Sequence, residues 1–166
     1  MSVDLALAKQ HLRVTHSNED TIIAAYLAAA KAWVERYTGK GLTDAERVET
    51  LPAFPVGDIS LAWGPYTADS LTITYLDSDL AEQTFTDFTV LSAFGATRVR
   101  ADDVWPTAES VTLTYDAGYT STPADLDAAV LLLTGEYYDN REAGTASSAA
   151  SMAVESLCHP HRSVRV

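Results

Sequence analysis

The sequence predicts an α+β fold: a bundle of about four helices that carries an inserted antiparallel β subdomain and ends in an extended C-terminal tail. Residues 17–39 repeat apolar side chains at steps of one, three and four, which is the pattern of an amphipathic helix. Residues 48–119 instead alternate apolar and polar side chains and are interrupted by Pro and Gly, as strands and turns are. The helical pattern returns after Thr122, so we expect the strands to be an insertion between helices that share one core.

The composition fits a folded domain with a strongly acidic surface. The chain has 166 residues, and its 23 acidic and 11 basic side chains give a net charge of -12. Such a body is not expected to bind duplex DNA through its phosphates. The single cysteine, Cys158, excludes an internal disulfide, and no apolar run or leader predicts a membrane span or secretion signal.

Two helices are expected in residues 1–46, the N-terminal part of the bundle. Ser2 can cap a short helix over residues 3–12, and a brief linker leads to the long helix. Ser17 or Asn18 can cap that second helix, and Gly39 offers the left-handed residue that ends it. Its apolar stripe contains Ile22, Ile23, Tyr26, Leu27, Ala30, Trp33, Val34 and Tyr37.

The β subdomain is expected over residues 47–121, as one antiparallel sheet. Alternation of apolar residues with Thr and other polar residues marks its strands. The predicted strands are 47–51, 59–63, 71–76, 84–91 with a break near Asp87, 97–100 and 111–115.

The third bundle helix is expected over residues 122–142 and the C-terminal appendage over residues 143–166. Thr122 and Pro123 form a helix start, and the apolar stripe that follows is Leu126, Ala129, Val130, Leu133 and Tyr137. Trp33 and Leu133 lie at the middle of the two longest stripes, so we expect each to be buried against the other's helix. Small residues at 143–150 suggest a flexible linker before a short helix at 152–158, which Pro160 stops.

Residues that could support catalysis or metal binding do not form a recognised constellation. Cys158, His159 and His161 lack a second cluster at zinc-ligand spacing. Asp77 and Asp79 have calcium-loop spacing without the glycine and glutamate that such a loop needs, so a charged hairpin turn is the better interpretation. We therefore expect no enzyme activity, no catalytic residues, no cofactor and no metal.

Several segments, taken in order, resemble the head-to-tail connector (adaptor) proteins of tailed bacteriophages and gene transfer agents. The similarity begins in residues 5–14 and in residues 20–39, and it continues through the Trp105-Pro106 pair. It then covers residues 111–119, which end in Asp-Ala-Gly-Tyr, and residues 123–141, which end in Glu-Tyr-Tyr-Asp-Asn-Arg. It closes with residues 154–157 and 160–162, so it spans nearly the whole chain.

The resemblance implies a structural protein of the virion neck, made in the bacterial cytoplasm. Such proteins assemble as a ring, usually twelvefold, beneath the portal protein, where they extend the DNA channel and present a surface to the next tail-side protein, a stopper or tail terminator. DNA is then only passing cargo, and no membrane is involved. The C-terminal segment of the family typically reaches the portal, which implies Leu157, Pro160, Arg162, Val164 and Arg165 as docking residues here.

The residues themselves leave a second function open. An acidic protein without a catalytic constellation could also be an autonomous binding or inhibitor protein that occupies a basic site on its target. For the connector, the small-residue linker before the basic tail predicts that the segment after it orders only when it docks on the portal.

Overall fold

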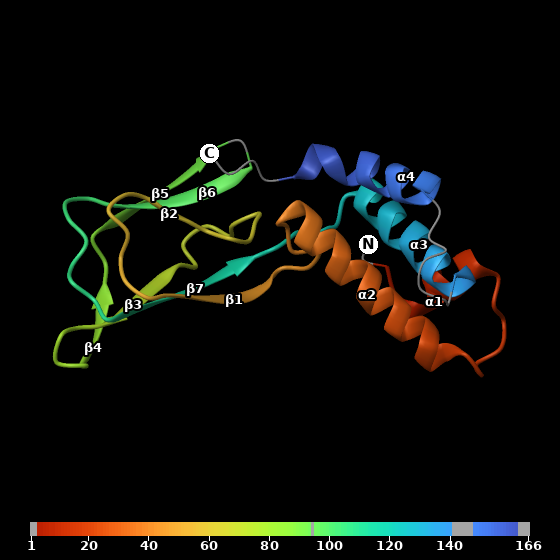
Figure 1. Ribbon diagram of the computed structural model, residues 1–166, viewed down its shortest axis with the longest axis horizontal. Coiled ribbons are helices and arrows are strands. Elements are labelled where there is room, and N and C mark those ends of the chain that lie inside the picture. The colour runs from red at the N-terminus through yellow and green to blue at the C-terminus, as the bar shows by residue number, and fades with distance from the viewer. Residues whose placement is uncertain (1–2, 94, 141–147, 163–166) are drawn as a thin grey trace. The chain divides into compact units, whose positions relative to one another are not determined.

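The chain forms two compact units, one helical and one built of strands. The structure is a computed structural model that describes residues 3–93, 95–140 and 148–162, without the side chains of 148–150. One unit contains the chain up to Leu42 together with Thr120 to Arg162, and the other is Thr43–Tyr119 (Figure 1). The helices and antiparallel sheets confirm the predicted α+β class.

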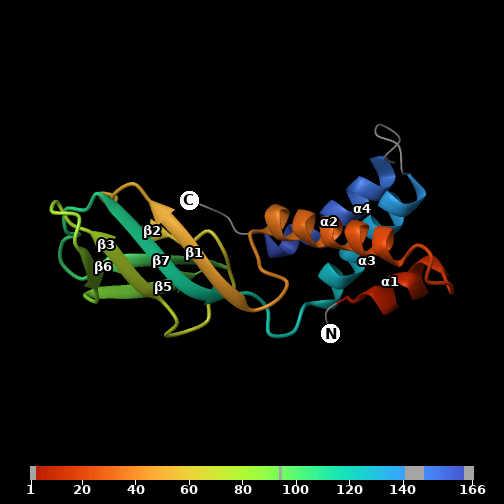
Figure 2. The ribbon, with the colours of Figure 1, turned by 90° about the horizontal axis from the view of Figure 1, so that it is seen from below.

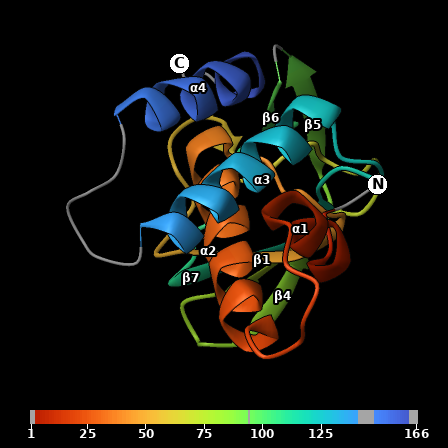
Figure 3. The same cartoon turned by 90° about the vertical axis from the view of Figure 1, so that its right-hand side faces the viewer.

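Four α-helices build the helical unit within the described residues. They are α1 (Leu5–Leu12), α2 (Asp20–Thr38), α3 (Ala124–Asp139) and α4 (Ser148–Cys158), and a short 3-10 helix, η1 (His159–His161), follows. Figure 3 shows α3 between α1 and α4, and α3 also packs along α2. The third helix of the chain is thus the centre of the bundle.

Apolar side chains from all four helices bury one common core. α2 contributes Ile23, Leu27, Ala30 and Val34, which belong to its predicted stripe. The α3 residues are Leu126, Ala129, Val130 and Leu133, again as predicted. Val3, Ala8, Leu42, Val154 and Cys158 complete the buried set.

Trp33 does not lie in this core, contrary to the prediction. Leu133 is buried, but Trp33 is only partly buried and its ring stacks on Tyr37 at 4.9 Å between centroids. Ile22 at the start of the stripe is 37% exposed. The buried face of α2 is therefore narrower than its apolar face.

The helix ends show which predicted caps form. Asp4 rather than Ser2 caps α1, since its carboxylate accepts a hydrogen bond from the Leu7 amide at 2.8 Å. α2 begins at Asp20 without a side-chain cap from Glu19, the residue before it, and ends as predicted at Gly39, whose φ is 68°. α3 begins one residue after Pro123, and the Thr122 hydroxyl donates instead to the Leu42 carbonyl at 2.9 Å.

The β unit contains two sheets, so the prediction of one sheet was wrong. Its strands are β1 (Ala45–Leu51), β2 (Ile59–Ser60), β3 (Thr72–Leu76), β4 (Glu82–Phe85), β5 (Phe88–Ala93), β6 (Ala96–Ala101) and β7 (Ser110–Ala117). A four-stranded sheet has the order β1-β7-β3-β4, and a three-stranded sheet has the order β2-β6-β5. In Figure 2, β1, β7 and β3 lie side by side, as their antiparallel pairing requires.

The two sheets enclose a single apolar core. β7 places Val111, Leu113, Tyr115 and Ala117 on its buried face, each at most 1% exposed. Ile73 joins them from β3, and Ile59, Leu61 and Val99 join them from the second sheet or next to it. The predicted break near Asp87 marks the passage from one sheet to the other, because β4 ends at Phe85 and β5 begins at Phe88.

A small polar cluster at the edge of this core joins β1, β7 and the loop after β2. The Tyr115 hydroxyl donates a hydrogen bond to Glu49, and it accepts one from the Trp63 amide at 3.2 Å. Glu49 also accepts a hydrogen bond from the Ala62 amide at 2.8 Å. Burial, followed by the hydrogen bond to Glu49, raises the pKa of the Tyr115 phenol, so this hydroxyl keeps its proton as a donor.

Truncating Leu133 tests the helical core. Leu133→Ala should lower the free energy of unfolding by about 2–5 kcal/mol through lost burial and the cavity left behind. The measurement is a denaturant titration followed by helical circular dichroism. Leu132→Ala is the matched control, since Leu132 is the adjacent residue and is 40% exposed. Equal effects of the two changes would contradict the assignment of Leu133 to the core.

A methyl group at Gly118 tests how closely the two ends of the β unit approach. The φ of Gly118 is 145°, and an added Cβ would overlap the Thr43 carbonyl and lie 2.7 Å from the Asp44 nitrogen. Gly118→Ala should therefore destabilise the β unit by roughly 1–3 kcal/mol from backbone strain, with the overlap adding to that cost. Gly57→Ala is the control because an added methyl there meets no atom within 4 Å. A thermal melt in which both variants match the parent would disprove this close approach.

Candidate functional site

The predicted portal-docking segment packs on the helical unit as far as the structure describes it. α4 contacts α3 and α2, and its own residues Val154 and Cys158 are fully buried. The helix begins at Ser148 rather than at residue 152, so it includes the last part of the predicted linker. The described segment up to Arg162 thus packs on the bundle, and ordering of the tail on docking stays a prediction.

Two side chains after α4 attach η1 to the helical unit. His161 Nε2 lies 2.6 Å from the Asp125 carboxylate on α3. Although partial burial opposes it, the hydrogen bond with His161 holds the pKa of the Asp125 carboxyl below its ordinary value. The Arg162 guanidinium lies 5.5 Å from the centroid of the Tyr37 ring, which in turn stacks on Trp33.

Cys158 has no sign of chemical reactivity. Burial, with a smaller contribution from the Asp125 charge, raises the pKa of its thiol to about 11. A thiol with such a pKa is protonated at neutral pH and is neither a good nucleophile nor a ready metal ligand. Its place in the structure is that of a small apolar residue on the buried face of α4.

The five predicted docking residues divide into a described and an undescribed part. Leu157 is partly buried, Pro160 is exposed, and Arg162 is exposed above Tyr37. Val164 and Arg165 lie outside the described residues. The structure brings the first three to one end of the helical unit, and their docking role stays a prediction.

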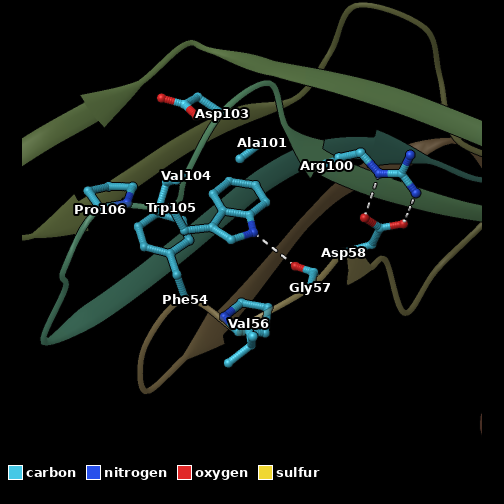
Figure 4. A pocket seen from close by; sticks show the side chains of 11 residues that line it. Phe54, Val56, Gly57, Asp58, Arg100, Ala101, Asp103, Val104, Trp105 and Pro106 are labelled. Carbon is cyan, nitrogen blue, oxygen red and sulfur yellow. Dashed lines mark hydrogen bonds and ion pairs between the residues drawn. The ribbon is translucent and has the colours of Figure 1, made fainter.

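A second candidate site, missed in the sequence, is an apolar pocket of the β unit. It has a volume of about 550 Å³ and is lined by two loops, one around Val56 and one around Val104 (Figure 4). Its floor is the stacked pair of Phe54 and Trp105, whose ring centroids are 4.9 Å apart. The Trp105 indole donates a hydrogen bond to the Gly57 carbonyl at 2.9 Å, which ties one loop to the other.

The rim of this pocket carries two exposed valines and three charged residues, of which Arg100 and Asp58 neutralise each other and Asp103 is exposed. Val56 is fully exposed and Val104 is 75% exposed, which is unusual for two valines beside one pocket. Arg100 donates two hydrogen bonds to Asp58, at 2.8 and 2.9 Å, and these hold the pKa of the Asp58 carboxyl below its ordinary value. In the sequence, the pocket is visible only as apolar residues beside Pro and Gly. This pattern does not predict a pocket, because it also occurs in ordinary turns.

The acidic turn that resembled a calcium loop is a hairpin turn, as predicted. The Asp77 carboxylate accepts hydrogen bonds from the amides of Asp79 and Ala81 at 2.9 and 3.0 Å. Across the described residues, no three His, Cys, Asp or Glu side chains gather closely enough to hold a metal ion. No helix in the same part of the chain is long and apolar enough to cross a membrane.

Solved structures with the same fold come from gene transfer agent (GTA) particles. The neck of an empty GTA particle computed with C6 symmetry contains a chain that is 27% identical, with a TM-score of 0.83. The match covers 99% of this chain and 91% of that one. The virion of a native GTA particle gives 26% identity, a TM-score of 0.82 and the same coverage. The neck of a native GTA particle computed with C12 symmetry gives 27% identity and a TM-score of 0.78, over 98% and 89% of the two chains.

The search of curated proteins finds no match. The family model described as "Head completion protein" matches residues 3–155, which include both units of the fold. A match of that length, together with the shared fold, shows that the chain belongs to the head completion protein family.

Proposed function

We propose that this protein is a head-to-tail connector in the neck of a phage or gene transfer agent particle. Many copies form a ring that joins the portal to the next tail-side protein, a stopper or tail terminator, and extends the channel for the passing DNA. The protein is a structural part of the particle and performs no reaction.

The observation that carries this proposal is the extent of the match to particle necks. The similarity covers 98–99% of this chain and about nine tenths of each matched chain, so it includes the helical unit and the β unit alike. A shared helical bundle alone would say little about function, because one fold serves many functions. A shared bundle with the same β insertion, at 26–27% identity, supports the same place in the particle.

The ring proposal rests on the symmetry of those necks. They were computed with C6 and C12 symmetry, and a ring of twelve copies satisfies both. A ring of this kind needs two different surfaces on each copy, one for each neighbour. Each copy has a net charge of -12, so these surfaces must overcome a general repulsion between copies.

The apolar pocket of the β unit supports binding to protein rather than catalysis. Its exposed valines and its aromatic floor offer apolar area, and the charges of Arg100 and Asp58 are already matched within the chain. The alternative of an autonomous acidic inhibitor gains no support, since the family and the matched structures are components of particles.

Removing the last four residues tests the proposed docking of the tail on the portal. Deletion of residues 163–166 leaves the His161 ion pair and the Arg162 contact in place, so the melting temperature should stay unchanged. Binding to the cognate portal should fall strongly, because Val164 and Arg165 are removed and the loss is repeated in every copy of the ring. Co-sedimentation with purified portal measures this binding.

The control is Met152→Ala, which changes a residue of α4 that is 71% exposed and outside the proposed docking segment. This variant should bind the portal like the parent. Normal co-sedimentation of the truncated protein would move the attachment surface from the tail to the bundle.

A further inference from the structure

Three exposed residues in the described part of the chain adopt a backbone conformation that favours glycine. Non-glycine residues with positive φ are Arg13 at 59°, Asp69 at 60° and Leu80 at 60°, within the described residues. Aspartate enters this region readily, whereas arginine and leucine do so at a cost. Strained residues of this kind often mark functional positions, which directs attention to the surroundings of Arg13 and Leu80.

Arg13 stands at the rim of a cationic pocket at the end of α1. The pocket, here called the α1 pocket, has a volume of about 380 Å³ and is lined by Ala6, Lys9, Gln10, Arg13, Val14 and Thr15. Lys9 is already paired with Asp20 at 2.6 Å. The Arg13 side chain is exposed and makes no hydrogen bond or ion pair with any residue that the structure describes. The lining contains two cations and no acid, in a chain whose net charge is -12.

Leu80 lies in the turn of the hairpin that β3 and β4 form. Its side chain is 69% exposed, and the acidic residues Asp79 and Glu82 beside it are exposed as well. Asp77 fixes the turn from inside, because its carboxylate also accepts a hydrogen bond from the Gln83 amide group at 3.1 Å. The result is an exposed apolar side chain on a hydrogen-bonded turn with carboxylates next to it, here called the β3–β4 knob and formed by Asp79, Leu80 and Glu82.

The chemistry of the knob is complementary to that of the pocket. We propose that the β3–β4 knob of one copy enters the α1 pocket of the neighbouring copy in the ring. Leu80 fills the apolar part of the pocket, and Asp79 and Glu82 lie near Arg13. The contact is heterologous, so each copy offers a knob to one neighbour and a pocket to the other. It rests on the proposed ring and gives that ring an attraction that opposes the repulsion between acidic copies.

Charge reversal on both sides gives a direct test. Arg13→Glu and Asp79→Lys should each raise the concentration needed for half-maximal ring assembly on the cognate portal by about tenfold or more, because like charges then face each other. An equimolar mixture of the two variants should recover assembly. When the variants alternate, the native Asp79 of one faces the native Arg13 of the other, and the introduced lysine faces the introduced glutamate. Every interface is then complementary, and a ring with an even number of copies closes.

Matched controls change the same charge elsewhere. Arg36→Glu in the last turn of α2 and Glu46→Lys in β1 alter exposed residues, and each should assemble like the parent alone and gain nothing from mixing. Native mass spectrometry of the mixture of Arg13→Glu and Asp79→Lys should show equal numbers of the two variants in each ring.

Glycine variants separate this role from a structural one. Arg13→Gly and Leu80→Gly keep the positive φ but remove its steric cost, so each monomer should melt at a slightly higher temperature, while loss of the side chain should weaken assembly. A residue with only a structural role would not move these two readouts in opposite directions.

Single charge variants that assemble normally, or a mixture that does not recover, would overturn the inference. Weaker binding of Arg13→Glu to duplex DNA with unchanged assembly would also overturn it and assign the pocket to phosphate. If the parent protein forms no ring on the portal, the proposed function itself fails. If the parent and both charge variants form normal rings, only the proposed contact fails.

Discussion

The pairing of β1 with β7 is the constraint on which the rest of the structure depends. The chain leaves the helical unit after Leu42 and returns to it at Thr120. Between these points, β1 and β7 pair in antiparallel register from Ala45 with Ala117 to Leu51 with Val111. The two ends of the insertion therefore meet at one place, and this pairing closes the long loop between the two parts of the helical unit.

Two local features keep this meeting point closed. Gly118 lets its backbone approach the Thr43 carbonyl, where any side chain would overlap it. Within the helical unit, the buried Thr122 hydroxyl donates to the Leu42 carbonyl, so the last residue before the insertion is tied to the first helix after it. Because the ends are fixed in this way, each unit can bury its own core. The pocket of Figure 4 and the β3–β4 knob are formed by loops that connect the strands.

The sequence predicted the helices and strands better than it predicted how they pack on one another. Period-two alternation identified β7 and β3, since it reports which face of a strand is buried. It does not report which strand lies alongside, so it could not distinguish two sheets from one. Likewise, the helical period of α2 correctly predicted that Ile23 and Leu27 are buried. It could not distinguish an aromatic side chain inside the core from one at the edge of the core, such as Trp33.

The candidate sites were harder to predict for a related reason. The docking hypothesis for residues 157–166 came from the resemblance to connector proteins, and the acidic body and basic tail agreed with it. The contact between His161 and Asp125 joins positions far apart in the sequence, so no local sequence pattern predicts it. The α1 pocket is lined by Arg13, whose backbone is left-handed. The sequence does not predict this conformation, because glycine is the usual residue at such a position.

Native-state amide hydrogen exchange tests most directly whether the β1–β7 pairing closes the insertion. We expect the hydrogen-bonded amides of β1, β3 and β7 to exchange through one common opening, with the same free energy and the same dependence on denaturant, because these strands are paired in one sheet. If the β1 amides exchanged as fast as those of exposed loops while β3 and β7 stayed protected, the insertion would not be closed by this pairing.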